Sequence, residues 1–138
     1  MDLSEIHALD LFCGTGAISF ELASHGAKSV TAADKNPKLL SFIRQQAELL
    51  DLPIKTLRVD IFRWIKKNRG TYDFIFADPP YHIDHHEDIP KFVLESGWLA
   101  KGGWLVVEHP DTIDFSNHPD FESHRVYGAV HFSFFTHE

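Results

Sequence analysis

The sequence has a single cysteine, no long apolar run and few basic residues in its second half. Because Cys13 has no second cysteine with which to form an intrachain disulfide, we expect a reduced, intracellular protein without a cysteine-based metal site. No stretch approaches the roughly 18 consecutive apolar residues that a membrane-spanning helix needs. The first residues also lack the basic and apolar regions of a secretory signal. These absences exclude a transmembrane protein and predict a cytoplasmic one.

The composition predicts one folded domain over residues 1–138, because 43% of the 138 residues are hydrophobic and 13% are aromatic. The net charge of −7 is unevenly divided: residues 1–69 carry +2 and residues 70–138 carry −9. Nucleic-acid binding normally draws on a basic surface. The chain offers one basic cluster, formed by Arg58, Arg63, Lys66, Lys67 and Arg69.

Strand-like and helix-like segments alternate along most of the chain, and Gly, Pro, Asn or Asp residues separate them. This alternation predicts an α/β fold with a parallel sheet covered by helices. We expect strands at 6–12, 28–33, 54–59, 72–77 and 104–108, and helices at 17–25, 37–50, 60–68 and 89–99. The helix that starts at Pro37 is expected to bury one stripe, formed by Leu39, Ile43, Ala47 and Leu50.

The last two strand-like segments differ from the rest. Residues 121–127 and 130–136 are separated only by Gly128 and Ala129, which leaves no room for a crossover helix. They are therefore predicted to form an antiparallel hairpin.

A glycine-containing turn, Asp10-Leu-Phe-Cys-Gly14-Thr-Gly16, lies where the first strand meets the first helix. Glycines let the backbone turn sharply and approach a ligand, and the helix start offers free N–H groups. A tight turn without a ligand and a dinucleotide site are the alternatives. Two details argue against the dinucleotide: Ser19 fits the third small position only loosely, and Asp10 precedes the first glycine by four residues.

Acidic residues end the next two predicted strands. Asp34 follows the second strand, where a carboxylate can accept both hydroxyl protons of a ribose. Asp60 follows the third strand, and with Ile61 and Phe62 it suits an adenine amino group against an apolar wall. Each acid taken singly is also a candidate helix cap. Ligands in open α/β sheets gather at the carboxyl ends of strands, so three acids at successive strand ends favour a nucleoside site.

The end of the fourth predicted strand carries Asp78-Pro79-Pro80-Tyr81. Here the chain resembles the amino-methylating branch of the S-adenosylmethionine-dependent methyltransferases, whose D/N-P-P-Y/F motif receives an exocyclic amino group. An amino group conjugated to a base is a poor nucleophile because its lone pair lies in the ring system. The Asp78 carboxylate and the Pro79 carbonyl can each accept an N–H bond and direct that lone pair toward the methyl group. Tyr81 supplies a face on which an extruded base can stack.

Other polar clusters are expected to have structural roles. Cys13 is predicted to pack in the turn, and the loop with His82, His85 and His86 is predicted to be solvated, with no metal site. Glu108 and His109 are interpreted as a strand terminus and not as an acid–base pair.

The resemblance extends over nearly the whole chain, through DLFCGTG, AADKNP, RVDIF, DFIFADPPY, GGWLVVE and RVYGAVHFSFF. These segments resemble the bacterial methyltransferases that modify guanine N2 in small-subunit ribosomal RNA. The resemblance implies a Rossmann-like class I methyltransferase fold, with a mostly parallel seven-stranded sheet and a C-terminal antiparallel hairpin. It also implies S-adenosyl-L-methionine as cofactor and ribosomal RNA or the small ribosomal subunit as partner. The expected catalytic residues are Asp78, Pro79 and Tyr81, and the expected cofactor-binding residues are Asp10, Phe12, Gly14, Gly16, Asp34, Lys35, Asp60 and Ile61.

The chain departs from this family at its start. Family members carry a basic hairpin and a helix before the first strand, whereas nine residues precede Asp10 here. The comparison implies that most of this N-terminal segment is lacking. Three readings stay open: a guanine-N2 methyltransferase of ribosomal RNA, a methyltransferase of adenine N6 or a protein glutamine, and a noncatalytic cofactor-binding module.

Overall fold

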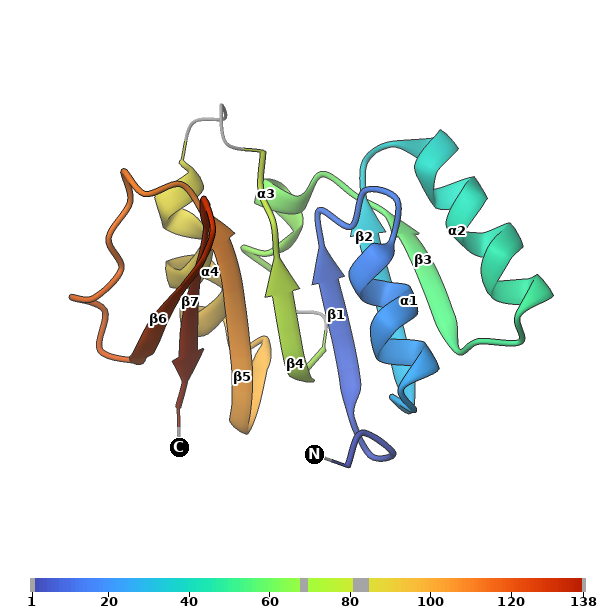
Figure 1. The fold of residues 1–138 in the computed structure, drawn as a ribbon, viewed down its shortest axis with the longest axis horizontal. Coiled ribbons are helices and arrows are strands. Elements are labelled where there is room, and N and C mark those ends of the chain that lie inside the picture. Colours follow the sequence, from blue (N-terminus) through green and yellow to red (C-terminus); the bar gives the residue numbers. More distant parts are fainter. Residues whose placement is uncertain (1, 68–69, 81–84, 138) are drawn as a thin grey trace.

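The computed structural model describes residues 2–67, 70–80 and 85–137, and in them it forms one seven-stranded sheet with helices on both faces (Figure 1). The strands are β1 (His7–Leu11), β2 (Ser29–Asp34), β3 (Ile54–Arg58), β4 (Tyr72–Ala77), β5 (Leu99–His109), β6 (Phe121–Tyr127) and β7 (Val130–Thr136). The helices are α1 (Ala17–Ser24), α2 (Pro37–Leu49), α3 (Ile61–Trp64) and α4 (Ile89–Glu95), with a 3₁₀ turn at His86–Asp88. None of the helices in the described part of the chain is long and apolar enough to cross a membrane.

The strand order is β3-β2-β1-β4-β5-β7-β6. The first five strands run parallel, whereas β7 runs antiparallel to both β5 and β6. The predicted α/β class, the mostly parallel sheet and the C-terminal antiparallel hairpin are therefore confirmed. The strand order reverses direction between β1 and β4, so the carboxyl ends of these strands border the crevice where open α/β sheets bind ligands.

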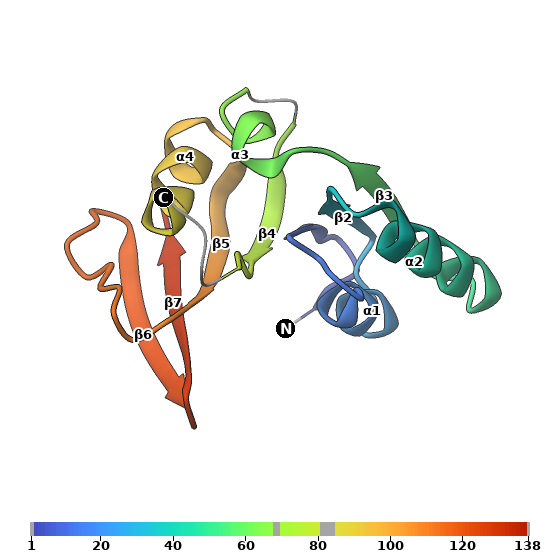
Figure 2. The ribbon, with the colours of Figure 1, turned by 90° about the horizontal axis from the view of Figure 1, so that it is seen from above.

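Helices α1 and α2 cover one face of the sheet, and α3 and α4 cover the other (Figure 2). The larger core lies on the α3 and α4 side, where strand residues such as Leu9, Ile75 and Leu105 pack against Ile65 and Val93. Trp98, which follows α4, is bonded to the residue that follows α3: its indole N–H donates to the carbonyl oxygen of Ile65 at 2.7 Å. Successive side chains point to opposite faces of the sheet, so consecutive residues of β1 and β2 are buried under the two helix layers.

Three predicted elements differ from the observed ones. Helix α4 ends at Glu95 and not near 99, because Gly97 adopts a φ of +76° that breaks the helix. Strand β5 begins at Leu99 and continues through both glycines, where a Cβ on Gly103 would lie 2.6 Å from the Asp73 carbonyl oxygen. Helix α3 covers only residues 61–64 of the predicted 60–68.

The buried stripe of α2 also differs from the prediction. Ile43 and Ala47 are buried as expected, but Leu40 completes the stripe, whereas Leu39 is half-buried and Leu50 is 61% exposed. Leu50 caps the exposed end of α2, where its backbone N–H still donates to the Gln46 carbonyl oxygen.

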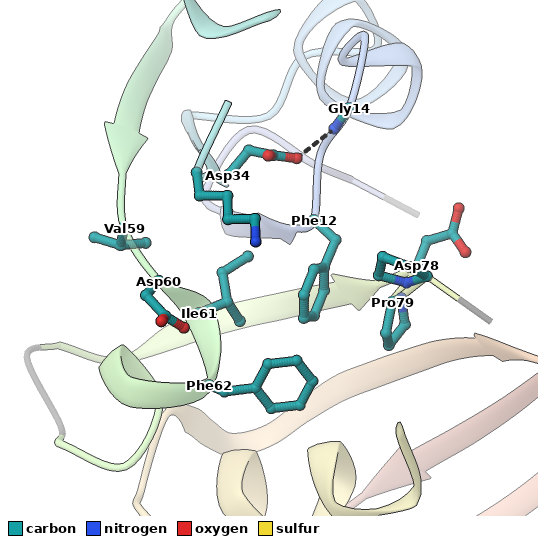
Figure 3. A pocket seen from close by; sticks show the side chains of 11 residues that line it. Phe12, Gly14, Asp34, Val59, Asp60, Ile61, Phe62, Asp78 and Pro79 are labelled. Carbon is teal, nitrogen blue, oxygen red and sulfur yellow. Dashed lines mark hydrogen bonds between the residues drawn. The ribbon is translucent and has the colours of Figure 1, made fainter. Parts of the chain in front are cut away.

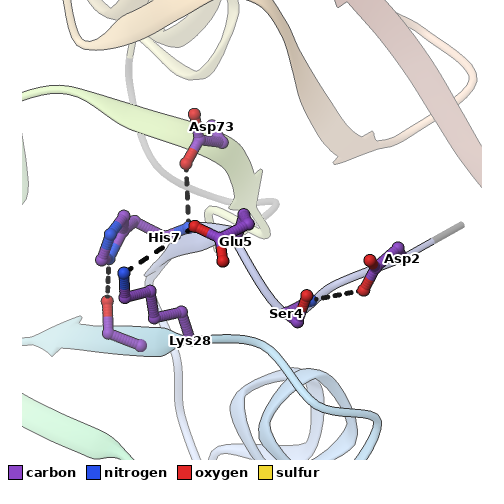
Figure 4. A network of polar contacts seen from close by, with 7 residues as sticks. Asp2, Ser4, Glu5, His7, Lys28 and Asp73 are labelled. Atoms are coloured by element: carbon purple, nitrogen blue, oxygen red, sulfur yellow. Dashed lines mark hydrogen bonds and ion pairs between the residues drawn. The ribbon is translucent and has the colours of Figure 1, made fainter.

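Polar contacts tie the start of β1 to its neighbours at the amino-terminal edge of the sheet (Figure 4). The His7 backbone N–H donates to the Asp73 carboxylate at 2.9 Å, and the His7 ring bonds the Ser29 hydroxyl at 2.6 Å. The Lys28 and Glu5 side chains form an exposed ion pair at 3.8 Å, which contributes little stability. These contacts lie at the edge opposite to the crevice, so they hold the scaffold without entering the site.

Candidate functional site

A cavity of about 370 Å³ lies at the carboxyl ends of β1, β2, β3 and β4 (Figure 3). Its walls come from the turn after β1, the residues that follow β2 and β3, and the segment that follows β4. Its lining residues are Phe12, Gly14, Asp34, Lys35, Val59, Asp60, Ile61, Phe62, Asp78, Pro79 and Pro80. The structure thus brings most of the predicted site residues to one cavity.

The turn after β1 has a left-handed backbone at three positions. Phe12, Gly14 and Gly16 have φ values of +58°, +55° and +85°. Phe12 is the unusual member, because a bulky residue rarely adopts this conformation. Its ring lies against the Phe62 ring with centroids 5.6 Å apart, so the turn directs an aromatic side chain into the cavity.

Gly16 precedes α1 and approaches α2 closely. A Cβ at this position would lie 2.9 Å from the Ile43 side chain, and the positive φ also favours glycine. Gly16 does not line the cavity in the described residues. It shapes the turn that exposes the backbone of Gly14.

Asp34 links the ends of β1 and β2. One carboxylate oxygen accepts the Gly14 backbone N–H and the other accepts the Asn36 backbone N–H, both at 3.0 Å. Each carboxylate oxygen can accept a further bond. The Asp34 carboxylate can therefore take the hydroxyl groups of a ribose while it fixes the turn.

The far wall of the cavity combines apolar side chains with one carboxylate. Ile61 is buried and Phe62 is half-buried, and Val59 extends this wall, which the sequence prediction did not include. Asp60 precedes α3, but its side chain makes no capping bond, and its ion pair with Arg63 at 3.8 Å is exposed. This wall fits a planar base, and the Asp60 carboxylate can accept a bond from an exocyclic amino group.

Asp10 is buried behind the glycine turn and not in the cavity lining. Its carboxylate accepts a 2.7 Å hydrogen bond from the Ser19 hydroxyl of α1, and burial raises the pKa of Asp10 to about 6. Asp10 therefore positions α1 and the turn, and its predicted contact with a cofactor stays a prediction.

This raised pKa makes a prediction about stability. Because the folded state holds the Asp10 proton more tightly than the unfolded chain, ionisation of Asp10 opposes folding as the pH rises from about 4 to above 6. We expect Asp10→Asn to be more stabilising at pH 8 than at pH 4, by up to about 3 kcal/mol from the size of the shift. Urea unfolding of both proteins at the two pH values measures this difference. Any effect of the substitution on packing is the same at both pH values, so it cancels when the two are compared. An equal effect at both pH values would show that Asp10 ionises normally in the fold.

Asp78 and Pro79 follow β4 at the other side of the cavity. Pro79 is buried and faces the aromatic wall, whereas the Asp78 carboxyl group points away from Ile61 and Phe62 (Figure 3). Burial, the hydrogen bond and charge of Glu108, and the charge of Asp10 together raise the pKa of Asp78 to about 7. Tyr81 and His82 lie outside the described residues, so the predicted stacking role of Tyr81 stays a prediction.

Glu108 is the interacting residue that the sequence analysis interpreted only as a strand terminus. It lies on β5, next to Asp78 at the end of β4, because Ala77 and Val107 are paired in the sheet. The signal that could have found it is the one used for Asp34 and Asp60, namely an acid at the carboxyl end of a parallel strand.

Cys13 agrees with its expected packing role, because it is buried and burial raises the pKa of its thiol. Among residues 85–88, which are the described part of the histidine loop, His85 is exposed as expected and contacts the Asp88 carboxylate at 3.2 Å. The expected solvation is wrong for His86, whose side chain is buried at the start of the 3₁₀ turn.

The chain is similar to known proteins over most of its length. Residues 1–136 match the family described as conserved hypothetical protein 95. The ribosomal RNA small subunit methyltransferase D of Buchnera aphidicola is 26% identical over 113 residues, which are 81% of this chain and 58% of that protein. The chain thus spans a little over half the length of this relative. The ribosomal RNA large subunit methyltransferase K/L of Hahella chejuensis is 38% identical over 74 residues, which are 52% of this chain and 10% of that protein.

A solved structure has the same fold. The Thermus thermophilus N2 methyltransferase of 16S rRNA, RsmC, solved with AdoMet and guanosine, superposes with a TM-score of 0.78 at 18% identity. The match covers 99% of this chain and 38% of that one.

Proposed function

This chain belongs to the family described as conserved hypothetical protein 95, and from that premise we propose that it transfers a methyl group from S-adenosyl-L-methionine to an exocyclic amino nitrogen. The proposed acceptor is the N2 amino group of a guanine in small-subunit ribosomal RNA, and residues 1–138 are proposed to act as one catalytic domain. One observation carries the proposal. The Asp78-Pro79 segment lies at the same cavity as the Gly14 and Asp34 pair, so an acceptor site adjoins a nucleoside site.

The cofactor fits the residues that line the cavity. Asp34 is placed to accept ribose hydroxyls, and Asp60 with Ile61 and Phe62 is placed to hold the adenine. S-adenosyl-L-methionine supplies an electrophilic methyl group on a sulfonium. Phe12 and Pro79 line the same cavity with apolar side chains, which would limit the access of water to a bound cofactor.

The catalytic contribution of the chain is the orientation of the acceptor amine. The ionised Asp78 carboxylate accepts one N–H bond, and the Pro79 carbonyl accepts the other. These bonds strengthen as the nitrogen becomes tetrahedral, so they stabilise the transition state more than the ground state. Because the ionised Asp78 carboxylate accepts this bond more strongly than the neutral acid does, the rate is expected to rise with pH through about 7.

Ribosomal RNA is supported as partner by the named relatives and by charge near the cavity. Arg63 and Lys67 line a second hollow of about 310 Å³, which shares Val59 and Asp60 with the cofactor cavity. This basic group, placed beside a cavity in an otherwise acidic protein, suits contact with RNA phosphates. Action on ribosomal RNA would place the protein in the cytoplasm.

The test is transfer of radiolabelled methyl to small ribosomal subunits, large subunits, free RNA and ribosomal protein. Mass analysis of the digested product then names the methylated group. We expect N2-methylguanosine from small-subunit RNA. Label in large-subunit RNA would assign the activity of the Hahella relative, while N6-methyladenosine or methylated glutamine would assign another member of the branch. Cofactor binding without transfer to any of these substrates would support the noncatalytic module.

A further inference from the structure

Asp78 and Glu108 form an adjacent pair of carboxyl groups at the rim of the sheet. Strands β4 and β5 are parallel neighbours, and their last paired residues are Ala77 and Val107. The next residue on each strand is the acid, so both side chains project from the same face. Both are half-buried. Phe76 and Val106 precede them by two residues on the same face, and Phe132 is paired with Glu108 on the neighbouring strand.

No basic side chain forms an ion pair with either acid among the described residues. The buried Asp10 is a third carboxyl group nearby. Burial of Asp78, together with the neighbouring Glu108 and Asp10, keeps a proton on Asp78 up to about neutral pH. A ligand that brings two N–H donors side by side would replace that proton and satisfy both carboxylates.

We propose that Asp78 and Glu108 together read the Watson–Crick edge of guanine, with Asp78 accepting from the N2 amino group and Glu108 accepting from N1–H. This inference rests on the proposed function and names the residue that selects the base. Guanine presents N1–H and the N2 amino group as neighbouring donors, whereas adenine presents an amino donor beside the bare N1 acceptor. The lone pair of adenine N1 would face the Glu108 carboxylate without a hydrogen, which disfavours adenine. The proton held by the free pair passes to solvent when guanine binds.

The test first maps the nucleotide that the protein methylates. It then uses oligoribonucleotides that carry either unmodified guanine or 2,6-diaminopurine at that position. The second base keeps the N2 amino group but has an acceptor at N1. We expect the wild-type protein to prefer guanine about 100-fold or more in kcat/KM, because a buried group left unpaired is strongly disfavoured. Glu108→Gln can donate its amide N–H to the N1 acceptor, so its preference for guanine should fall about 10-fold or more. Glu95→Gln, an exposed substitution at the end of α4, should keep the wild-type preference.

A pH profile adds a readout that a purely structural role would not change. Removal of the Glu108 charge lowers the pKa of Asp78, so the rise of the methylation rate with pH should move to lower pH in Glu108→Gln. A wild-type protein that methylates both bases equally well would overturn the inference without any variant, and so would a folded Glu108→Gln that keeps the full preference. In both cases guanine methylation continues, so the proposed function stands. A wild-type protein that methylates no guanine would overturn both.

Discussion

Asp78→Ala is expected to lower the single-turnover rate of methyl transfer about 100- to 1000-fold, the typical cost of removing one preorganised hydrogen-bond partner of a transition state. Cofactor affinity should stay close to the wild-type value, because Asp78 is assigned to the acceptor amine. The raised pKa of Asp78 means that its ionised form destabilises the folded protein above pH 7. Loss of this charge should therefore not lower the thermal midpoint at that pH. The measurements are the single-turnover rate, the affinity for S-adenosylhomocysteine and the thermal midpoint.

Asp78→Asn provides the matched comparison. The amide keeps a carbonyl oxygen that accepts an N–H bond, so part of the rate should return, but the rise of the rate with pH through about 7 should disappear. Asp111→Ala removes an exposed carboxyl group from the loop after β5 and should leave rate and affinity unchanged. An Asp78→Ala protein with full activity, or one equally impaired in cofactor binding, would contradict the assignment of Asp78.

The sequence predicted the fold well where a regular pattern of hydrophobic residues is bounded by turn-forming residues. Strand β4 and the β6–β7 hairpin lie at the predicted residues, because each is a regular run bounded by turn residues. The boundary between α4 and β5 was wrong because Trp98 lies four residues after Leu94, a spacing that fits the buried stripe of a helix. Gly97, at a φ of +76°, ends the helix, and Trp98 then packs in the core with its indole N–H bonded to the Ile65 carbonyl oxygen.

The site was predictable for residues that end successive strands, since strand ends of a parallel sheet meet at one edge. Asp34, Asp60 and Asp78 do line one cavity. The pairing of Asp78 with Glu108 was not predictable from local pattern, because it depends on β4 and β5 being neighbours in a particular register. The burial of Asp10 behind the turn likewise follows from its bond to Ser19 across the strand–helix junction.

Asp34→Ala is expected to weaken binding of S-adenosylhomocysteine about 100-fold or more, because a charged hydrogen bond contributes about 1.5 to 3 kcal/mol and two ribose bonds would be lost. The structure adds a second consequence. The substitution also removes the acceptor for the Gly14 and Asn36 backbone N–H groups, so the thermal midpoint should fall as well.

The two consequences of Asp34→Ala can be separated with Asn36→Ala, which destabilises the same region without touching the cavity lining. The Asn36 side chain caps α2 by accepting from the backbone N–H groups of Lys38 and Leu39, and loss of such a cap costs about 1 kcal/mol. Asn36→Ala should therefore lower the thermal midpoint while it retains affinity for S-adenosylhomocysteine. Calorimetric titration of each protein with S-adenosylhomocysteine and with NAD gives the comparison, and NAD should bind none of them. If Asp34→Ala binds S-adenosylhomocysteine as tightly as Asn36→Ala does, Asp34 supports only the turn, and the ribose must be held by other residues of the cavity.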